Sequence, residues 1–160
     1  MIISRIGNLL QDDKVNVIVH QCNCHHIMGG GIARIISQLY PEAKDADLKT
    51  PYGDPEKMGS YSHARTKDGK VIVNVYSQFR TSSGERETSY DALTIALTKL
   101  EASLRNSSNG TKYVLGVPYG LGSDLARGSW TVVRAIIESV FAKSPIEMHI
   151  VRLPDAKELE

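Results

Sequence analysis

The chain has 160 residues, of which 41% are hydrophobic and 23% charged, a size and composition typical of one globular domain. Its 19 basic and 18 acidic residues leave a net charge of +1, so there is no broad electrostatic attraction toward nucleic acid or anionic membranes. No stretch approaches the roughly 20 apolar residues that cross a bilayer, and no signal peptide is evident, so we expect no membrane contact. Free cysteines favour a cytoplasmic location.

Apolar runs rich in β-branched residues alternate with runs of helical periodicity, which predicts an α/β fold. In chain order we expect strands at 2–7 and 15–22, helices at 31–40 and 42–48, strands at 60–65 and 70–78, a helix at 90–105, a strand at 113–117, a helix at 130–142 and a strand at 147–153. The second strand is apolar on both faces and should be central. Asp68 and Gly69 form a hairpin signal, so the sheet should be mixed.

Two of the predicted helices begin with capping signals. Thr88 and Asp91 have the spacing of a capping box before the helix at 90–105. Ser129 is the expected N-cap of the helix at 130–142.

A glycine-rich loop follows the central strand. Residues 29–31 are three consecutive glycines, and an apolar helix begins directly behind them. Glycines let backbone N–H groups approach a ligand, and a helix N-terminus adds unpaired donors and partial positive charge. Together they suit a phosphate. The alternative is a tight turn with close helix packing. Neither a P-loop nor a dinucleotide-binding fingerprint fits this spacing.

A second glycine-rich loop connects a strand to a helix at residues 117–130, with the sequence VPYGLGSDLARGSW. Ligands of open α/β sheets bind beyond the carboxyl ends of the strands. Two such loops at neighbouring strand ends would enclose a pyrophosphate from opposite sides.

These two loops make the chain resemble the macro domain family. The resemblance rests on the order strand, Cys-Asn, Gly-Gly-Gly-Ile-Ala, then Pro-x-Gly-x-Gly and Trp before the last helix, and it covers nearly the whole chain. The segments HQCNC, GGGIA and YPEA resemble the branch that dephosphorylates ADP-ribose 1''-phosphate. The resemblance implies a three-layer α/β/α sandwich with about six strands over residues 1–153, followed by a polar tail at 154–160.

The resemblance also implies roles for individual residues. Asn23 corresponds to the asparagine that orients the distal ribose, and Asn8 lies where many macro domains carry an aspartate for the adenine amino group. The residues expected to contact the ligand are Asn8, Asn23, Gly29, Gly30, Gly31, Ile32, Gly120, Leu121, Gly122 and Ser123. Another branch of the family uses a lysine nucleophile where this chain has Gln78, which cannot form a Schiff base.

The candidate catalytic residues are His20, Asp124 and Asn23. An imidazole with a pKa near ~6.5 suits proton transfer, although a histidine in a central strand is equally consistent with a satisfied core residue. Asp124 lies in a phosphate loop and is expected to activate water or to accept a ribose hydroxyl. The alternative is a solvated helix-entry cap.

His20, Cys22, Cys24 and His26 alternate along the chain like a possible zinc set. Extended neighbours of this kind seldom converge on a tetrahedral centre, and no second ligand pair exists, so we expect no metal and no cofactor.

The resemblance implies a hydrolase that removes the terminal phosphate from ADP-ribose 1''-phosphate, and we expect it to be a monomer. Its partners would be small ADP-ribose derivatives. The alternatives are a non-catalytic ADP-ribose-binding module and an ADP-ribosyl hydrolase that acts on modified macromolecules.

Overall fold

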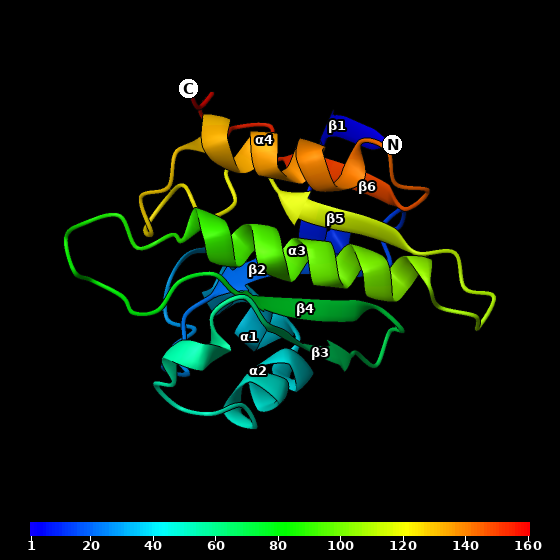
Figure 1. Ribbon diagram of the computed structural model, residues 1–160. Coiled ribbons are helices and arrows are strands. Elements are labelled where there is room, and N and C mark those ends of the chain that lie inside the picture. The colour runs from blue at the N-terminus through cyan, green and yellow to red at the C-terminus, as the bar shows by residue number, and fades with distance from the viewer.

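The computed structural model describes residues 1–160 and contains six strands, four α-helices and two short 3-10 helices (Figure 1). In chain order these are β1 (Ile2–Ile6), η1 (Leu9–Gln11), β2 (Val17–Cys22), α1 (Gly31–Leu39), α2 (Pro41–Leu48), η2 (Pro55–Lys57), β3 (Tyr61–Arg65), β4 (Val71–Tyr76), α3 (Tyr90–Arg105), β5 (Val114–Pro118), α4 (Trp130–Phe141) and β6 (Glu147–Arg152). Every predicted strand and helix is present, with ends that differ by at most two residues.

The strands form one mixed sheet in the order β1-β6-β5-β2-β4-β3. All neighbouring pairs are parallel except β3 and β4, the hairpin predicted around Asp68 and Gly69. The predicted central position of β2 is confirmed, since β2 pairs with β4 on one side and β5 on the other. The parallel strands therefore end at one edge of the sheet, and the loops that follow them lie side by side.

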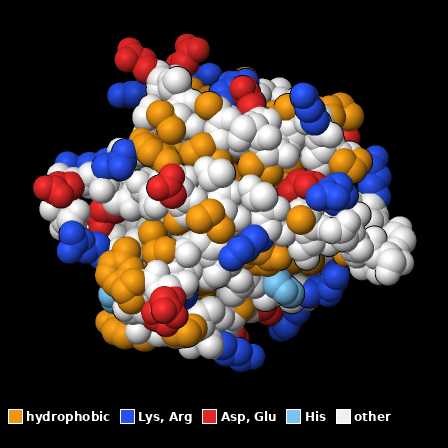
Figure 2. Space-filling model, viewed as in Figure 1, with side chains coloured by type: hydrophobic (Ala, Val, Ile, Leu, Met, Phe, Trp, Pro, Cys, Tyr) orange, Lys and Arg blue, Asp and Glu red, His pale blue; other side chains and the backbone are white.

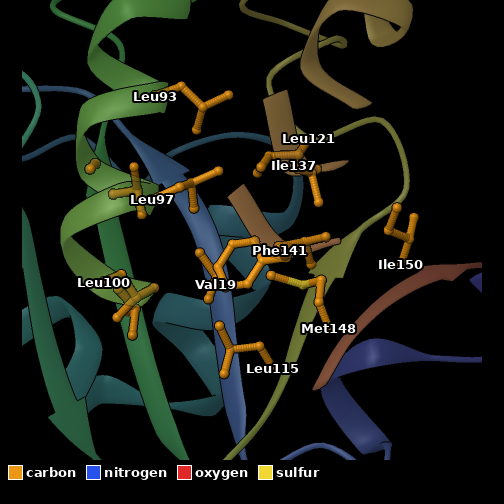
Figure 3. Close-up of a cluster of buried hydrophobic side chains, with 14 of the residues drawn as sticks. Val19, Leu93, Leu97, Leu100, Leu115, Leu121, Ile137, Phe141, Met148 and Ile150 are labelled. Carbon is orange, nitrogen blue, oxygen red and sulfur yellow. The ribbon is translucent and has the colours of Figure 1, made fainter. Parts of the chain in front are cut away.

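Two pairs of helices cover the two faces of the sheet, which gives three layers (Figure 1). The larger core lies under α3 and α4, where Leu93, Leu97 and Leu100 of α3 face Ile137 and Phe141 of α4 and the inward side chains of the strands (Figure 3). A smaller core lies under α1 and α2 and includes Ile18, Ile36, Ala43 and Ile72. The expected α/β/α sandwich is confirmed.

The helix caps agree with the sequence at one helix and differ at the other. Ser129 caps α4, as predicted, and its side chain accepts from the N–H of Val132. The cap of α3 is Ser89 and not Thr88. The Thr88 hydroxyl instead donates to the carbonyl oxygen of Gly122 at 2.6 Å, so a contact distant in sequence takes the place of the predicted local one.

Residues 154–160 form no helix or strand but pack against the end of β5. The N–H of Leu159 donates to the Tyr119 hydroxyl at 2.6 Å, and Arg152 donates to the carbonyl oxygen of Ala156 at 2.8 Å. On the face shown in Figure 2, acidic and basic side chains are interspersed, in keeping with the small net charge. None of the helices combines the length and apolar composition needed to span a bilayer.

Candidate functional site: a cleft at the carboxyl ends of the strands

A cleft of about 950 Å³ lies where the parallel strands end. Its walls come from η1, the loop between β2 and α1, the loop between β4 and α3, the loop between β5 and α4, and the segment after β6. We call the second of these the first glycine loop (residues 23–31) and the fourth the second glycine loop (residues 119–128). Both lie at the middle of the cleft because β2 and β5 are neighbours in the sheet.

The first glycine loop presents unpaired backbone donors. Gly29, Gly30 and Gly31 all line the cleft, and Gly31 opens α1 with a φ of 56°, a backbone conformation that favours glycine. None of the N–H groups of residues 29–33 has an acceptor within the protein. These donors and the positive end of the α1 dipole form a site for an anion.

The second glycine loop presents a matching set of donors. The N–H groups of Gly120, Gly122, Asp124, Leu125 and Ala126 have no acceptor within the protein. All five residues line the cleft. The two loops face each other at close range, because a Cβ placed on Gly30 would lie 2.7 Å from Cδ1 of Leu125.

One contact within the second glycine loop and several from outside it fix its shape. The carbonyl oxygen of Gly122 accepts from the Thr88 hydroxyl at 2.6 Å and from the N–H of Gly128 at 2.8 Å. Thr88 in turn accepts from Nε2 of Gln21 at 3.0 Å, and Oε1 of Gln21 accepts from the Ser77 hydroxyl at 2.6 Å. A polar chain from β2 and the end of β4 therefore holds the bend at Gly122.

The two ends of the cleft differ in chemistry. The end beside β1 and β6 is mainly apolar; its lining includes Leu9, Leu10, Ile32, Ile35, Leu39, Val151, Leu153 and Ala156. Asn8 also lies there, and its side-chain oxygen accepts from the N–H of Leu10 at 3.2 Å. The end beside β4 is polar; its lining includes Gln21, Gln78, Thr81, Ser82 and Glu87. The cleft therefore suits a ligand with a flat apolar group, a central anion and a hydroxylated group.

Most of the predicted ligand-contacting residues line this cleft, and Ser123 does not. The Ser123 hydroxyl donates to the carbonyl oxygen of Leu121, and its N–H donates to that of Gly120 at 2.8 Å, so both groups are used within the turn. Asp124 lines the cleft with an exposed side chain.

Asn23 lines the cleft but also closes the first glycine loop. Its Nδ2 donates to the carbonyl oxygen of Ile27 at 2.6 Å, and its Oδ1 accepts from the N–H groups of His25 and Ile27 at 2.9 and 3.4 Å. These are local bonds from an asparagine side chain to backbone, the type that shapes loops. One hydrogen of the amide remains for a ligand.

The structure does not bring His20 to the cleft. Its side chain is fully buried on the face of the sheet covered by α1 and α2. Asn74 donates through Nδ2 to the carbonyl oxygen of Ala43 and to the Ser62 hydroxyl, so its Oδ1 accepts from Nε2 of His20 at 2.7 Å. Burial lowers the pKa of His20 to about 4, which keeps the ring neutral. His20 is a satisfied core histidine, because the alternation of side chains along β2 turns it away from the side of Gln21.

The cysteines and the neighbouring histidines have structural contacts. Burial raises the pKa of both the Cys22 and the Cys24 thiols. His25 bonds the carbonyl oxygen of Phe79 at 2.8 Å, and His26 bonds that of Thr50 at the same distance. No group of three or more His, Cys, Asp or Glu side chains is placed to hold a metal ion.

Sequence reasoning missed Gln21, Thr88 and Glu87. Gln21 stands beside a predicted site residue, yet nothing local shows that it reaches Thr88. Glu87 lies in the polar segment 79–89, which has no periodicity and no glycine-phosphate pattern. The antiparallel bridge between Gln78 and Thr88, together with the bonds of Glu87 and Thr88 to the carbonyl oxygen of Ala126, brings that segment to the cleft.

The sheet order, the three layers and the cleft between two glycine loops define a macrodomain fold. The macrodomain of Mycobacterium tuberculosis DarG superposes with a TM-score of 0.75 and 22% identity, over 97% of this chain and 99% of that one. Thermosipho africanus DarTG, solved in complex with ADP-ribose, superposes with a TM-score of 0.70 and 16% identity, over 92% of this chain and 40% of that one.

No family model matches the sequence. A curated relative is the uncharacterized 17.5 kDa protein of the tk-vs intergenic region of Enterobacteria phage T4. It is 31% identical over 134 residues, which cover 81% of this chain and 82% of the phage protein. The chain belongs to the same family as that phage protein.

Proposed function

We propose that the cleft binds ADP-ribose and its derivatives. The observation that carries this proposal is the double row of unpaired N–H groups, from residues 29–33 on one side and from Gly120, Gly122 and residues 124–126 on the other. A diphosphate is the anion that two facing rows of donors fit best. The solved complex of Thermosipho africanus DarTG with ADP-ribose supports the same ligand class.

The ends of the cleft support the rest of the assignment. The apolar end beside β1 and β6 would take the adenine ring, and the polar end beside β4 would take the distal ribose. A reversed ligand would put the ring against Thr81 and Glu87 and leave their polar groups without partners, at a cost of about 1–3 kcal/mol each.

We further propose that the protein removes the terminal phosphate from ADP-ribose 1''-phosphate. A water oxygen would attack phosphorus, the bond from phosphorus to the anomeric oxygen would break, and that oxygen would take up a proton. Asp124 is the candidate acceptor of the water proton, and the second-loop amides would stabilise charge on the phosphoryl group. His20 has no part in this proposal because it lies in the core.

Phosphate release from ADP-ribose 1''-phosphate tests the enzymatic proposal. We expect release by the wild-type protein and a loss of at least about a hundredfold in kcat for Asp124→Asn, a typical effect of removing a proton acceptor. The His20→Gln variant, which keeps an N–H donor toward Asn74, should retain activity. If the wild-type protein releases no phosphate, the proposed phosphatase activity is refuted.

A non-catalytic ADP-ribose-binding module is the second candidate. It is favoured by the hydrogen bonds of Asn23, which are directed to its own loop, and by the exposure of Asp124. Calorimetry with ADP-ribose, combined with turnover assays, separates the two candidates. Binding of ADP-ribose without turnover of ADP-ribose 1''-phosphate, ADP-ribosylated protein or ADP-ribosylated nucleic acid would leave only the binding module.

A further inference from the structure

Glu87 lines the cleft, and one of its carboxylate oxygens is buried without a hydrogen-bond partner. Oε1 of Glu87 accepts from the N–H of Ser83 at 3.2 Å, whereas Oε2 is buried and has no partner in the protein. Glu87 is one of the residues that line the cleft. Buried polar atoms of native proteins nearly always have a partner, and a carboxylate without one is especially costly. Glu87 as a whole is only half-buried, so a small rotation of its side chain would turn this oxygen into the cleft, where a ligand would supply the missing partner.

The backbone holds Glu87 firmly in this position. Its N–H donates to the carbonyl oxygen of Ala126 at 2.8 Å, and the N–H of Thr88 donates to the same oxygen at 3.2 Å. On the other side, Arg127 donates to the carbonyl oxygen of Gly84. The segment 83–88 is thus joined to the second glycine loop, and the side chain of Glu87 stays at the polar end of the cleft.

The charge of Glu87 restricts what its partner can be. A carboxylate accepts hydrogen bonds and repels phosphate, so the direct partner of Oε2 is not a phosphate oxygen. Arg127 is committed to the carbonyl oxygen of Gly84 and is exposed. A neutral donor fits best, and the hydroxyls of a sugar next to the diphosphate are donors at the right end of the cleft.

We infer that Glu87 determines ligand specificity by accepting a hydrogen bond from a hydroxyl of the sugar beyond the diphosphate. This inference rests on the proposed binding of ADP-ribose. It adds that the cleft distinguishes ligands with that sugar from ADP, through a carboxylate at the end of the β4–α3 loop rather than through the glycine loops.

Calorimetry with ADP-ribose and with ADP tests the inference. The Glu87→Gln variant keeps the shape and the bond to the N–H of Ser83 but loses the charge. We expect it to weaken ADP-ribose binding about tenfold, in line with a charge-assisted hydrogen bond. ADP lacks the sugar and carries more negative charge, so its affinity should stay the same or increase.

Glu85→Gln is the matched control. It makes the same charge change on the same segment, at an exposed residue that does not line the cleft, and it should leave both affinities unchanged. Equal weakening of ADP and ADP-ribose in Glu87→Gln, or no change for ADP-ribose, would overturn the inference while the proposed function stands. Wild-type protein that binds neither nucleotide would overturn both.

Discussion

The two glycine loops present similar rows of N–H donors but are held in shape in different ways. The bend of the first is closed by Asn23, which bonds to backbone no more than four residues away. The bend of the second is held by Thr88, which lies 34 residues from Gly122. The first loop is therefore encoded largely by its own residues, and the second depends on the packing of distant strands. Four substitutions test this difference.

The largest effect is expected for Gly128→Val in the second loop. A Cβ at this position would lie 2.5 Å from the carbonyl oxygen of Gly122 and 3.1 Å from Cβ of Thr88. The oxygen belongs to the backbone and cannot move aside cheaply, so the bend must open at a cost of about 3 kcal/mol. Urea unfolding should show this loss together with loss of ADP-ribose binding. Wild-type stability would mean that the second loop is not fixed in the way described.

Gly30→Val in the first loop should separate binding from stability. Its new Cβ would meet only Cδ1 of Leu125, the end of a side chain that is 66% exposed and free to turn away. Stability should stay within about 0.5 kcal/mol of wild type. The branched side chain would occupy the path of the diphosphate, so ADP-ribose affinity should fall at least about a hundredfold. Unchanged affinity in a folded variant would refute the location of the diphosphate.

Asn23→Ala should weaken ADP and ADP-ribose together, by about tenfold each, because loss of its loop bonds loosens the row of donors that both ligands use. Asn23→Asp is the informative companion, since it keeps the acceptor for the N–H groups of His25 and Ile27 but loses both amide hydrogens and adds a negative charge beside the anion site, so it should weaken both ligands further. A loss confined to ADP-ribose would instead assign Asn23 to the distal ribose, as the sequence comparison with macro domains implied.

The smallest effect is expected for Thr88→Val, which keeps the shape of the side chain. It removes the bonds to Gly122 and Gln21 but leaves Gly122 its bond from the N–H of Gly128. We expect a loss of about 1 kcal/mol in stability and a few-fold loss in ADP-ribose affinity. Thr98→Val, in which the lost hydroxyl bonds only to the helix carbonyl of Thr94, should change neither. Equal results for the two variants would mean that Thr88 does not support the loop.

The same distinction explains what could be predicted from the sequence. Hydrophobic periodicity gave all strands and helices, and the hairpin signal at Asp68 and Gly69 gave the antiparallel edge. The first glycine loop was visible because glycines and a helix start are neighbours in the chain. These features depend on residues close in sequence.

The misses depend on residues far apart. Thr88 was assigned to a helix cap because its reach to Gly122 is not encoded locally. His20 was placed in the site because the sequence does not show that its side chain points into the core, where it bonds to Asn74, rather than toward the end of β2. No pattern in the sequence distinguishes Glu87, because the feature that singles it out, an oxygen atom without a partner, arises only after folding.

The order of the strands also determines when the cleft can form. β1 lies at an edge of the sheet and pairs only with β6, so that Ile2 is placed beside Met148. During synthesis β1 cannot pair until β6 has been made, and until then one edge of β5 is unpaired. The strands that carry both glycine loops are complete earlier, so the nascent chain acquires its anion site before its apolar end. A chain that stops before β6 would expose two strand edges and should be prone to aggregation.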